Sequence, residues 1–170
     1  MTTSPITTRL ATQADAGAIA AIYNEGIADR IATFETEPRT TEQIQGQLRD
    51  KGDRFPTVVA ERDGQIVAWA TAGAYRSRPA YAGVAEHSVY VARAARGTGA
   101  GRAALEAFCR TYAERGFWKI VSRIFPENAA SLALHERCGF RVVGVYRRHG
   151  KLEGAWRDCV IVERMLDEGP

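Results

Sequence analysis

A glycine-rich turn directly after a short apolar strand is the most chemically informative stretch of the chain. Val89, Tyr90 and Val91 are β-branched or aromatic, and glycines follow at positions 97, 99 and 101. An amphipathic segment around Phe108 comes next, so the pattern predicts strand, turn and helix. The first amides of a helix lack internal partners and lie at the positive end of its dipole, so they bind anions, most often phosphate. Arg96 adds a positive charge at this turn.

The turn alone leaves the phosphate ligand open. A Walker A loop ends in Gly-Lys-Ser/Thr, whereas Gly101 is followed by Arg102 and Ala103. Residues 99–104 fit the loose dinucleotide pattern G-x-G-x-x-A. That fold usually needs an acidic residue at the end of the next strand, and residues 120–124 read Ile-Val-Ser-Arg-Ile. The rest of the chain must therefore decide which ligand binds.

Two sequence blocks resemble the cofactor region of the GNAT superfamily (GCN5-related N-acetyltransferases). They are Arg96-x-x-Gly99-x-Gly101 and Asn128-x-x-Ser131-x-x-Leu134-His135-Glu136-x-x-Gly139-Phe140. In that family the loop amides hold the CoA pyrophosphate, and the exposed edge of the preceding strand pairs with the pantetheine arm. The resemblance implies acetyl-CoA as cosubstrate. The implied binding residues are Val89, Tyr90, Val91, Arg96, Gly97, Thr98, Gly99, Ala100, Gly101, Asn128 and Ser131.

The elements that position this turn are predicted from periodicity, caps and breakers. Thr12 and Asp15 form a capping box, Thr40 or Thr41 caps a second helix that runs to about Asp50, and Asp63-Gly64 is a hairpin signal. The remaining helices are Gly99–Arg115 and a short one that Pro126-Glu-Asn128 opens and Gly139 ends. The predicted strands are Ile6–Ala11, Thr57–Arg62, Gln65–Tyr75, Ala85–Val91, Lys119–Phe125, Phe140–Arg148 and Ala155–Arg164, the last two joined through Gly150 and Gly154.

This order predicts one α/β domain over residues 1–170, with a central mixed sheet flanked by helices. The central hairpin breaks the regular strand–helix alternation of a doubly wound fold. The order matches the GNAT acyltransferase fold, and the resemblance implies that the fourth and fifth strands splay apart to admit the cofactor.

Glu86 is the candidate general base, because it starts the strand that leads into the turn. An amine must lose its proton before it attacks a thioester, and a carboxylate accepts it directly or through one water. The alternative is a solvated glutamate at a strand edge. Glu86-His-Ser-Val-Tyr-Val91 closely resembles the segment Glu-Ser-Thr-Val-Tyr-Val of the phosphinothricin N-acetyltransferases, whose proposed catalytic glutamate falls on Glu86.

That subfamily implies a small glutamate analogue with a free α-amine as substrate. Phosphinothricin, methionine sulfoximine, methionine sulfone and arsinothricin are of this type, and their acetylation confers resistance by detoxification. Competing functions are acetylation of a protein N-terminus or an aminoglycoside, and a CoA-binding module without catalysis. The subfamily also implies a homodimer.

His135 is a candidate general acid for the leaving thiolate, because the pKa of an imidazole lies near neutrality. Its alternative is a helix-face histidine bonded to a neighbour. Asn128 and Ser131 are candidates for contacts to the pantetheine amides, and Asn128 also fits an N-cap of the short helix.

Arg76 and Arg78 lie two residues apart and point the same way in extended chain, so they suit a substrate with two acidic groups. Two solvated loop arginines are the alternative. Phe34 stands in the polar connection Ala28–Pro38, which has no clear period and suits a lid, with ordinary packing as its alternative.

Composition is that of an ordinary globular protein, and its mild positive charge suits a polyanionic small molecule as ligand. The net charge of +3 is too mild to indicate nucleic acid, and no apolar run reaches the roughly 18 residues of a membrane span. Three widely spaced cysteines favour reduced thiols in the cytoplasm, and we expect no signal peptide. His87 and His149 have no ligand-like spacing, so we expect no metal site.

Overall fold

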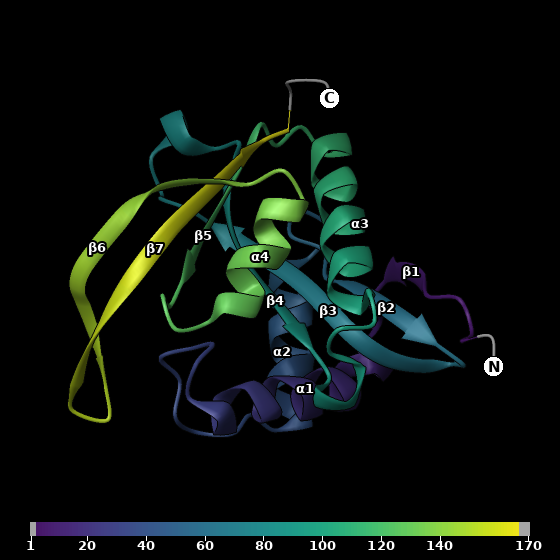
Figure 1. Cartoon of the computed structure of the whole chain (residues 1–170). Coiled ribbons are helices and arrows are strands. Elements are labelled where there is room, and N and C mark those ends of the chain that lie inside the picture. Colours follow the sequence, from purple (N-terminus) through teal and green to yellow (C-terminus); the bar gives the residue numbers. More distant parts are fainter. Residues whose placement is uncertain (1–2, 167–170) are drawn as a thin grey trace.

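The computed structural model describes residues 3–166, which form a seven-stranded sheet with helices on both faces (Figure 1). The strands are β1 (Thr7–Leu10), β2 (Val58–Arg62), β3 (Gln65–Ala74), β4 (Val84–Val91), β5 (Lys119–Ile124), β6 (Arg141–Leu152) and β7 (Ala155–Met165). The α-helices are α1 (Ala16–Asp29), α2 (Thr41–Lys51), α3 (Ala100–Glu114) and α4 (Ala129–Arg137). Short 3-10 helices are η1 (Gln13–Asp15), η2 (Pro79–Tyr81) and η3 (Arg93–Ala95). The predicted order of elements is confirmed.

Local sequence signals define the helix starts and the central hairpin. Thr12 and Asp15 form the capping box of η1, which continues into α1, and Thr40 caps α2 in a second box with Gln43. Asp63 and Gly64 both have positive φ, at 52° and 74°, which is the turn that matches the twist of the β2–β3 hairpin.

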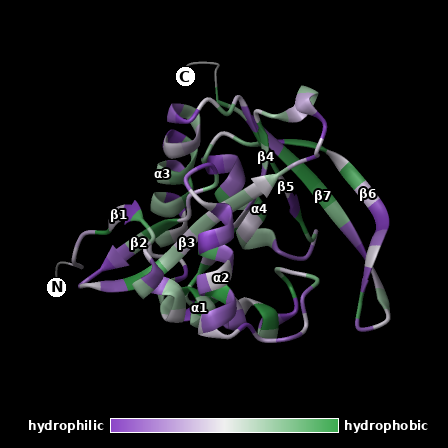
Figure 2. Ribbon diagram, turned by 180° about the vertical axis from the view of Figure 1, so that it is seen from behind, coloured by the Kyte–Doolittle hydropathy of each residue, from purple (hydrophilic) through white to green (hydrophobic). Residues whose placement is uncertain are grey.

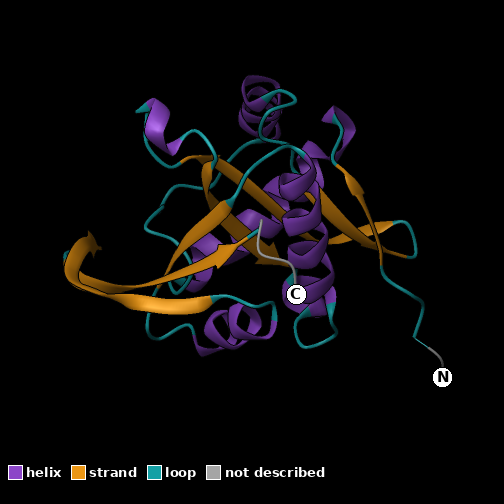
Figure 3. Ribbon diagram, turned by 90° about the horizontal axis from the view of Figure 1, so that it is seen from above, coloured by secondary structure: helices purple, strands orange, loops and turns teal. Residues whose placement is uncertain are grey.

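Two hydrophobic cores attach the helices to opposite faces of the sheet. One lies under α1 and α2, around Ile19, Ile44 and Trp69. The other lies under α3 and α4, where Phe108 and Tyr112 are fully buried. Figure 3 shows helices on both sides of the strands. Burial of each such side chain contributes about 1.5–3 kcal/mol, so the sheet is fixed from both sides.

Strands β4 and β5 are the one parallel pair among the described strands, and they separate soon after they meet. The sheet order is β1-β2-β3-β4-β5-β7-β6. The β4–β5 ladder ends at Glu86, which lies opposite Val121, whereas β4 continues against β3 to Val91. Just beyond the ladder, the Ser122 hydroxyl donates to the His87 carbonyl at 3.2 Å. The expected mixed α/β sheet with a splay between its fourth and fifth strands is confirmed.

The C-terminal hairpin differs from the prediction at its turn. We expected the first strand to end at Arg148, with Gly150 in the connection, but β6 continues through Gly150 to Leu152. Arg148 has a φ of 48° and its amide donates to Asp158, so an irregular step in the register lets the strand resume. The turn falls at Glu153 and Gly154. The hairpin extends beyond the helices in both Figure 1 and Figure 3.

Candidate active site

A small cavity of about 40 Å³ lies where β4 and β5 part. Both strands, the following turn and helix α4 line it, together with Ala32 after α1. The lining residues are Ala32, His87, Ser88, Val89, Tyr90, Ser122, Arg123, Ile124, Phe125, Asn128, Ser131 and His135. The cavity thus brings Val89 and Tyr90 of the predicted strand together with three predicted residues of the second block.

The start of α3 forms an open surface of backbone amides. Gly99 occupies the N-cap position with a φ of 90° and no side chain caps the helix, and Gly97 has a φ of 74°. A Cβ added to Gly97 or Gly99 would meet nothing within 4 Å, so a ligand can approach this backbone closely. Fifteen residues of helix stand behind these amides. The geometry fits an anionic group such as a pyrophosphate.

Gly101, in the same turn, is needed for close packing and not for access to the backbone. A Cβ at this position would lie 2.9 Å from Val91 Cγ2 and 3.1 Å from Leu134 Cδ2. The glycine therefore allows the first turn of α3 to pack directly on β4 and α4. The predicted residues Thr98 and Ala100 flank the glycines, with the Thr98 hydroxyl bonded to the Ala95 carbonyl.

Arg96 lies at this turn, but its guanidinium is bound to helix α1. Nη2 of Arg96 is 2.7 Å from Asp29, which also pairs with Arg93 at 2.7 Å. The hydrogen bonds from Arg93 and then Arg96 lower the pKa of the Asp29 carboxyl. The cation is thus held at the edge of the loop by the end of α1.

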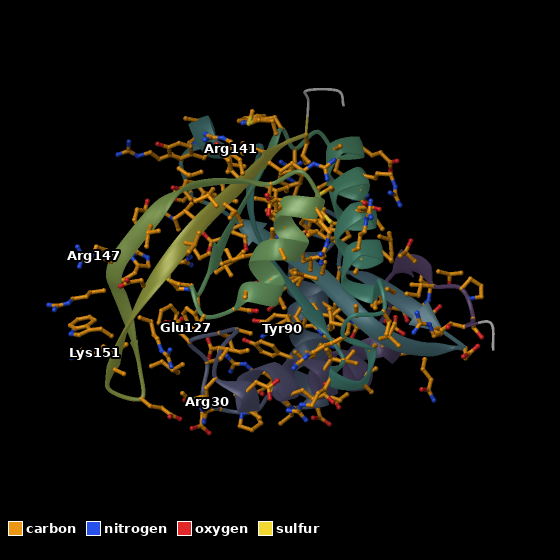
Figure 4. All side chains as sticks on the ribbon, in the orientation of Figure 1. Arg30, Tyr90, Glu127, Arg141, Arg147 and Lys151 are labelled. Carbon is orange, nitrogen blue, oxygen red and sulfur yellow. The ribbon has the colours of Figure 1, made fainter. Side chains whose placement is uncertain are left out.

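Tyr90 offers its backbone to the cavity, because its ring is packed elsewhere. The ring stacks on Trp69 with centroids 4.9 Å apart and meets Tyr23 edge-on at 4.9 Å. A Cβ on Gly26 would come within 2.9 Å of it. Burial, with Tyr23 nearby, raises the pKa of the Tyr90 phenol. In the view of Figure 4, Tyr90 is labelled between α4 and α1.

Glu86 forms an ion pair with Arg123, a residue that sequence analysis did not select. Oε1 of Glu86 lies 2.5 Å from Nη2 of Arg123, and the two side chains are 25% and 46% exposed. Glu86 ends the β4–β5 ladder and Arg123 lies on β5 two residues beyond it, so the splay brings them together. The available signal was a charged residue in the interior of the predicted strand Lys119–Phe125, between Ser122 and Ile124.

His135 is buried and contacts His87, a residue to which we had assigned no partner. The two Nε2 atoms are 2.8 Å apart, and His135 Nδ1 lies 2.7 Å from the Ser131 carbonyl. Nδ1 therefore donates to that carbonyl, and His135 Nε2 accepts from His87. Burial lowers the pKa of both imidazoles, and for His87 the charge of His135 lowers it further. Both rings are neutral at neutral pH.

This histidine pair predicts a loss of stability in mild acid. Unfolded imidazoles have a pKa of about 6.5, and the folded ones lie lower, so the unfolded state takes up more protons as the pH falls below 6.5. Each buried histidine then costs about 1.4 kcal/mol per pH unit until its folded pKa is reached. We expect the melting temperature to fall between pH 7 and pH 5, and His87→Gln to flatten that slope. The exposed His149 provides the control: His149→Gln should leave the slope unchanged. If the melting temperature fell equally steeply with pH in wild type and in both variants, the role of the buried histidine pair would be contradicted.

The second block of predicted residues lies at the start of α4. Asn128 is the N-cap of this helix, and its side-chain oxygen accepts from the Ser131 amide at 3.2 Å. Its NH2 group is left to donate to a ligand. The Ser131 hydroxyl lies 3.3 Å from His135 Nδ1. Both residues line the cavity, so the capping role leaves Asn128 able to contact a ligand as well.

Phe34 lies at the edge of the cavity, in the connection between α1 and α2. Its ring meets Phe125, a lining residue, edge-on with centroids 4.8 Å apart, and a Cβ on Gly150 would stand only 2.7 Å from Phe34 Cζ. The Asn24 side chain bonds both backbone groups of Arg39, which holds the connection against α1. The irregular part begins after Asp29, so residues 28 and 29 of the predicted connection belong to α1.

Arg76 and Arg78 lie outside this cluster. Both are exposed and neither lines the cavity. The Arg76 guanidinium bonds the Tyr75 carbonyl at 2.8 Å and stacks 4.3 Å over the Tyr75 ring, while Arg78 precedes η2. They follow β3, whose Gly73 pairs with Glu86.

Residues 3–166 contain neither a cluster of metal-ligating side chains nor a helix suited to a bilayer. No group of three His, Cys, Asp or Glu side chains there could hold a metal ion. In the same range, no helix combines the length and the apolar character that crossing a bilayer requires. Cys109, Cys138 and Cys159 are buried and unpaired.

Comparison with known proteins agrees with the fold. The family model for the "Acetyltransferase (GNAT) domain" matches residues 8–161. The chain is 36% identical over 166 residues to phosphinothricin N-acetyltransferase of Alcaligenes faecalis, covering 96% of this chain and 84% of that protein. It is 33% identical over 168 residues to an L-methionine sulfoximine/L-methionine sulfone acetyltransferase of Salmonella typhimurium, covering 96% of each.

A solved structure is also similar to this chain over most of its length. The phosphinothricin acetyltransferase of Sinorhizobium meliloti, in complex with acetyl-CoA, superposes with a TM-score of 0.86 at 33% identity, covering 96% of this chain and 90% of that one. The splayed strands, the open helix start and these similarities agree, and the chain belongs to the GNAT superfamily of N-acetyltransferases.

Proposed function

We propose that this enzyme transfers the acetyl group of acetyl-CoA to the α-amine of a small glutamate analogue, without an acyl-enzyme. The observation that carries the proposal is a continuous path along β4. It runs from Glu86, past the cavity at the splay, to the open amides that begin α3. The phosphinothricin and methionine sulfoximine activities in the names of its relatives favour this substrate class.

The cofactor groups are assigned by charge and shape. The Arg96–Gly101 turn receives the pyrophosphate, because its glycines leave the amides open. The edge of Val89–Val91 that faces away from β3 pairs with the pantetheine arm, with Asn128 and Ser131 across the cavity. Acetyl-CoA supplies the activated acyl group, and an amide of Val89–Val91 donates to its carbonyl oxygen as negative charge develops there.

Proton movements fall to Glu86 and His135. Glu86 accepts a proton from the substrate ammonium, which leaves a neutral amine that can attack. His135 returns a proton to the departing sulfur. The ring is neutral in the present structure, with its one proton on Nδ1 bonded to the Ser131 carbonyl and with Nε2 accepting from His87. His135 must therefore first release His87 and take up a proton from water at Nε2, and it becomes neutral again when that proton passes to the sulfur.

Substrate contacts come from the face of the sheet that carries Glu86. Phe34 covers the apolar stem of the substrate from the α1–α2 connection. Arg76 and Arg78 donate to the oxygen atoms at the terminus of its side chain, which requires their guanidiniums to turn from their present contacts toward β4. Phosphinothricin and arsinothricin carry an acidic terminus, whereas methionine sulfone and methionine sulfoximine carry a neutral one whose oxygens still accept hydrogen bonds from a guanidinium. N-acetylation would detoxify all four in the cytoplasm.

A homodimer is proposed on the outer strand of the sheet. Val142, Val143, Val145 and Tyr146 of β6 are 59%, 50%, 51% and 52% exposed, and Trp156 on β7 is 54% exposed. Figure 2 colours parts of this hairpin hydrophobic. The edge of β6 is unpaired within the described sheet, and two copies related by a two-fold axis would cover the same apolar residues on each other.

The proposal predicts a selective pattern of thiol release from acetyl-CoA. We expect rapid release with phosphinothricin, arsinothricin or an amino-acid sulfone. Aminoglycosides, which are polycations, and peptides with free N-termini should give little. Mass spectrometry of the product should show one acetyl group on the α-amine. Preference for a peptide or an aminoglycoside would support the competing acetyltransferase functions, and tight acetyl-CoA binding without turnover would support a binding module.

A further inference from the structure

We propose that the Glu86–Arg123 ion pair is the receptor for the charged end of an α-amino acid, in which Arg123 binds the α-carboxylate while Glu86 binds the ammonium. The inference rests on the proposed function and adds a specificity-determining residue to it. Its starting point is the 2.5 Å contact between the two side chains at the splay.

Position supports this role for Arg123. Its side chain lines the cavity together with Ser88 and Tyr90 of β4, and it is 46% exposed, so a small molecule can reach it. Arg76 and Arg78 lie beyond β3 and line no part of this cavity. Arg123 is the one arginine among the lining residues, and its present partner is the proposed base.

The ion pair and the substrate have complementary charges. An α-amino acid carries its ammonium and carboxylate on one carbon, and Glu86 and Arg123 present the opposite charges in direct contact. Binding exchanges one ion pair for two: guanidinium with carboxylate, which can be bidentate, and carboxylate with ammonium. An exposed pair contributes about 0–1 kcal/mol, so opening the Glu86–Arg123 contact costs little compared with what the substrate restores.

The exchange also prepares the base for its proton. While Arg123 holds Glu86, the carboxylate oxygen is engaged by a cation. When the substrate carboxylate takes the guanidinium, Glu86 is left facing the ammonium. Glu86 then accepts one proton, becoming a neutral carboxylic acid, and the nitrogen recovers the lone pair that attacks the acetyl carbon. An amine without an adjacent carboxylate leaves the ion pair closed, so it should be acetylated poorly.

The test compares L-methionine sulfone with its carboxamide in wild type, Arg123→Gln and Arg123→Lys. We expect wild type to have a higher kcat/KM for the acid than for the carboxamide. Arg123→Gln should lower kcat/KM for the acid by about 10- to 30-fold, as expected for the loss of one hydrogen-bonded charge, and should change kcat/KM for the carboxamide little. Arg123→Lys should recover part of the loss. The affinity of the acetyl-CoA-free protein for the acid, measured by calorimetry, should fall in parallel. Arg102→Gln on α3, which removes a surface pair with Glu106, is the matched control and should change neither value.

The outcomes separate this inference from the function on which it rests. If wild type acetylates none of the amino acids, the proposed substrate class fails. If wild type acetylates the acid while Arg123→Gln shows unchanged binding and unchanged acid-to-amide preference, the substrate class stands and the role of Arg123 is refuted. An equal loss on acid and carboxamide also refutes carboxylate recognition, because a general disturbance of the site would affect both.

Discussion

Glu86→Gln is expected to lower kcat by about 100- to 10,000-fold, the usual contribution of a positioned general base. The substitution keeps the shape of the side chain and removes its ability to accept the ammonium proton. Glu86 lies at the last rung of the β4–β5 ladder, opposite Val121, so the amide should stay in place. Steady-state kinetics with saturating acetyl-CoA and an amino-acid sulfone would measure the loss.

The same variant should bind acetyl-CoA as wild type does, because the glycine turn lies at the other end of β4. Its melting temperature should also be nearly unchanged, since the Glu86–Arg123 pair is partly exposed and contributes about 0–1 kcal/mol. Glu106→Gln removes another partly exposed pair, with Arg102 on α3, and serves as the matched control. A kcat for Glu86→Gln within a few-fold of wild type would remove Glu86 from the mechanism.

Local signals predicted most of the fold because each depends on residues close in sequence. The capping boxes at Thr12 and Thr40 and the Asp63-Gly64 turn all appear where expected. The glycine turn before α3 was also found from sequence, because a turn that needs positive φ and an open helix start can be recognised within a few residues. The β6–β7 turn was misplaced, because an irregular register step at Arg148 has no clear local signature.

The contacts in the site that could not be predicted from the sequence depend on how distant segments pair and pack. Arg123 meets Glu86 only because β4 and β5 run parallel and part after that rung. His87 meets His135 only because α4 packs over the same face of β4. Alternation along each strand gives the face of a residue but not its partner across the sheet. Long-range register, set by the packing of the whole core, decides these contacts.

Gly99→Asn is expected to weaken acetyl-CoA binding on the order of 100-fold, as the loss of two hydrogen bonds to a charged group would do. Gly99 has a φ of 90°, and asparagine tolerates such a left-handed backbone better than other side chains do. The new side chain would stand over the amides that begin α3, where a Cβ now meets nothing within 4 Å. It would therefore block close approach of the pyrophosphate without disturbing the packing of the turn. Calorimetric titration with acetyl-CoA gives the Kd.

Gly116→Asn is the matched control for this effect. Gly116 follows the other end of α3, with a φ of 82° and equally open space around its Cβ position. Both variants should thus lose a similar amount of stability, about 1 kcal/mol, from placing a side chain at positive φ. Only Gly99→Asn should lose acetyl-CoA affinity if the cofactor pyrophosphate rests on the start of the helix. Equal Kd values for the two variants would place the pyrophosphate elsewhere, and the cofactor arrangement along β4 would have to be abandoned.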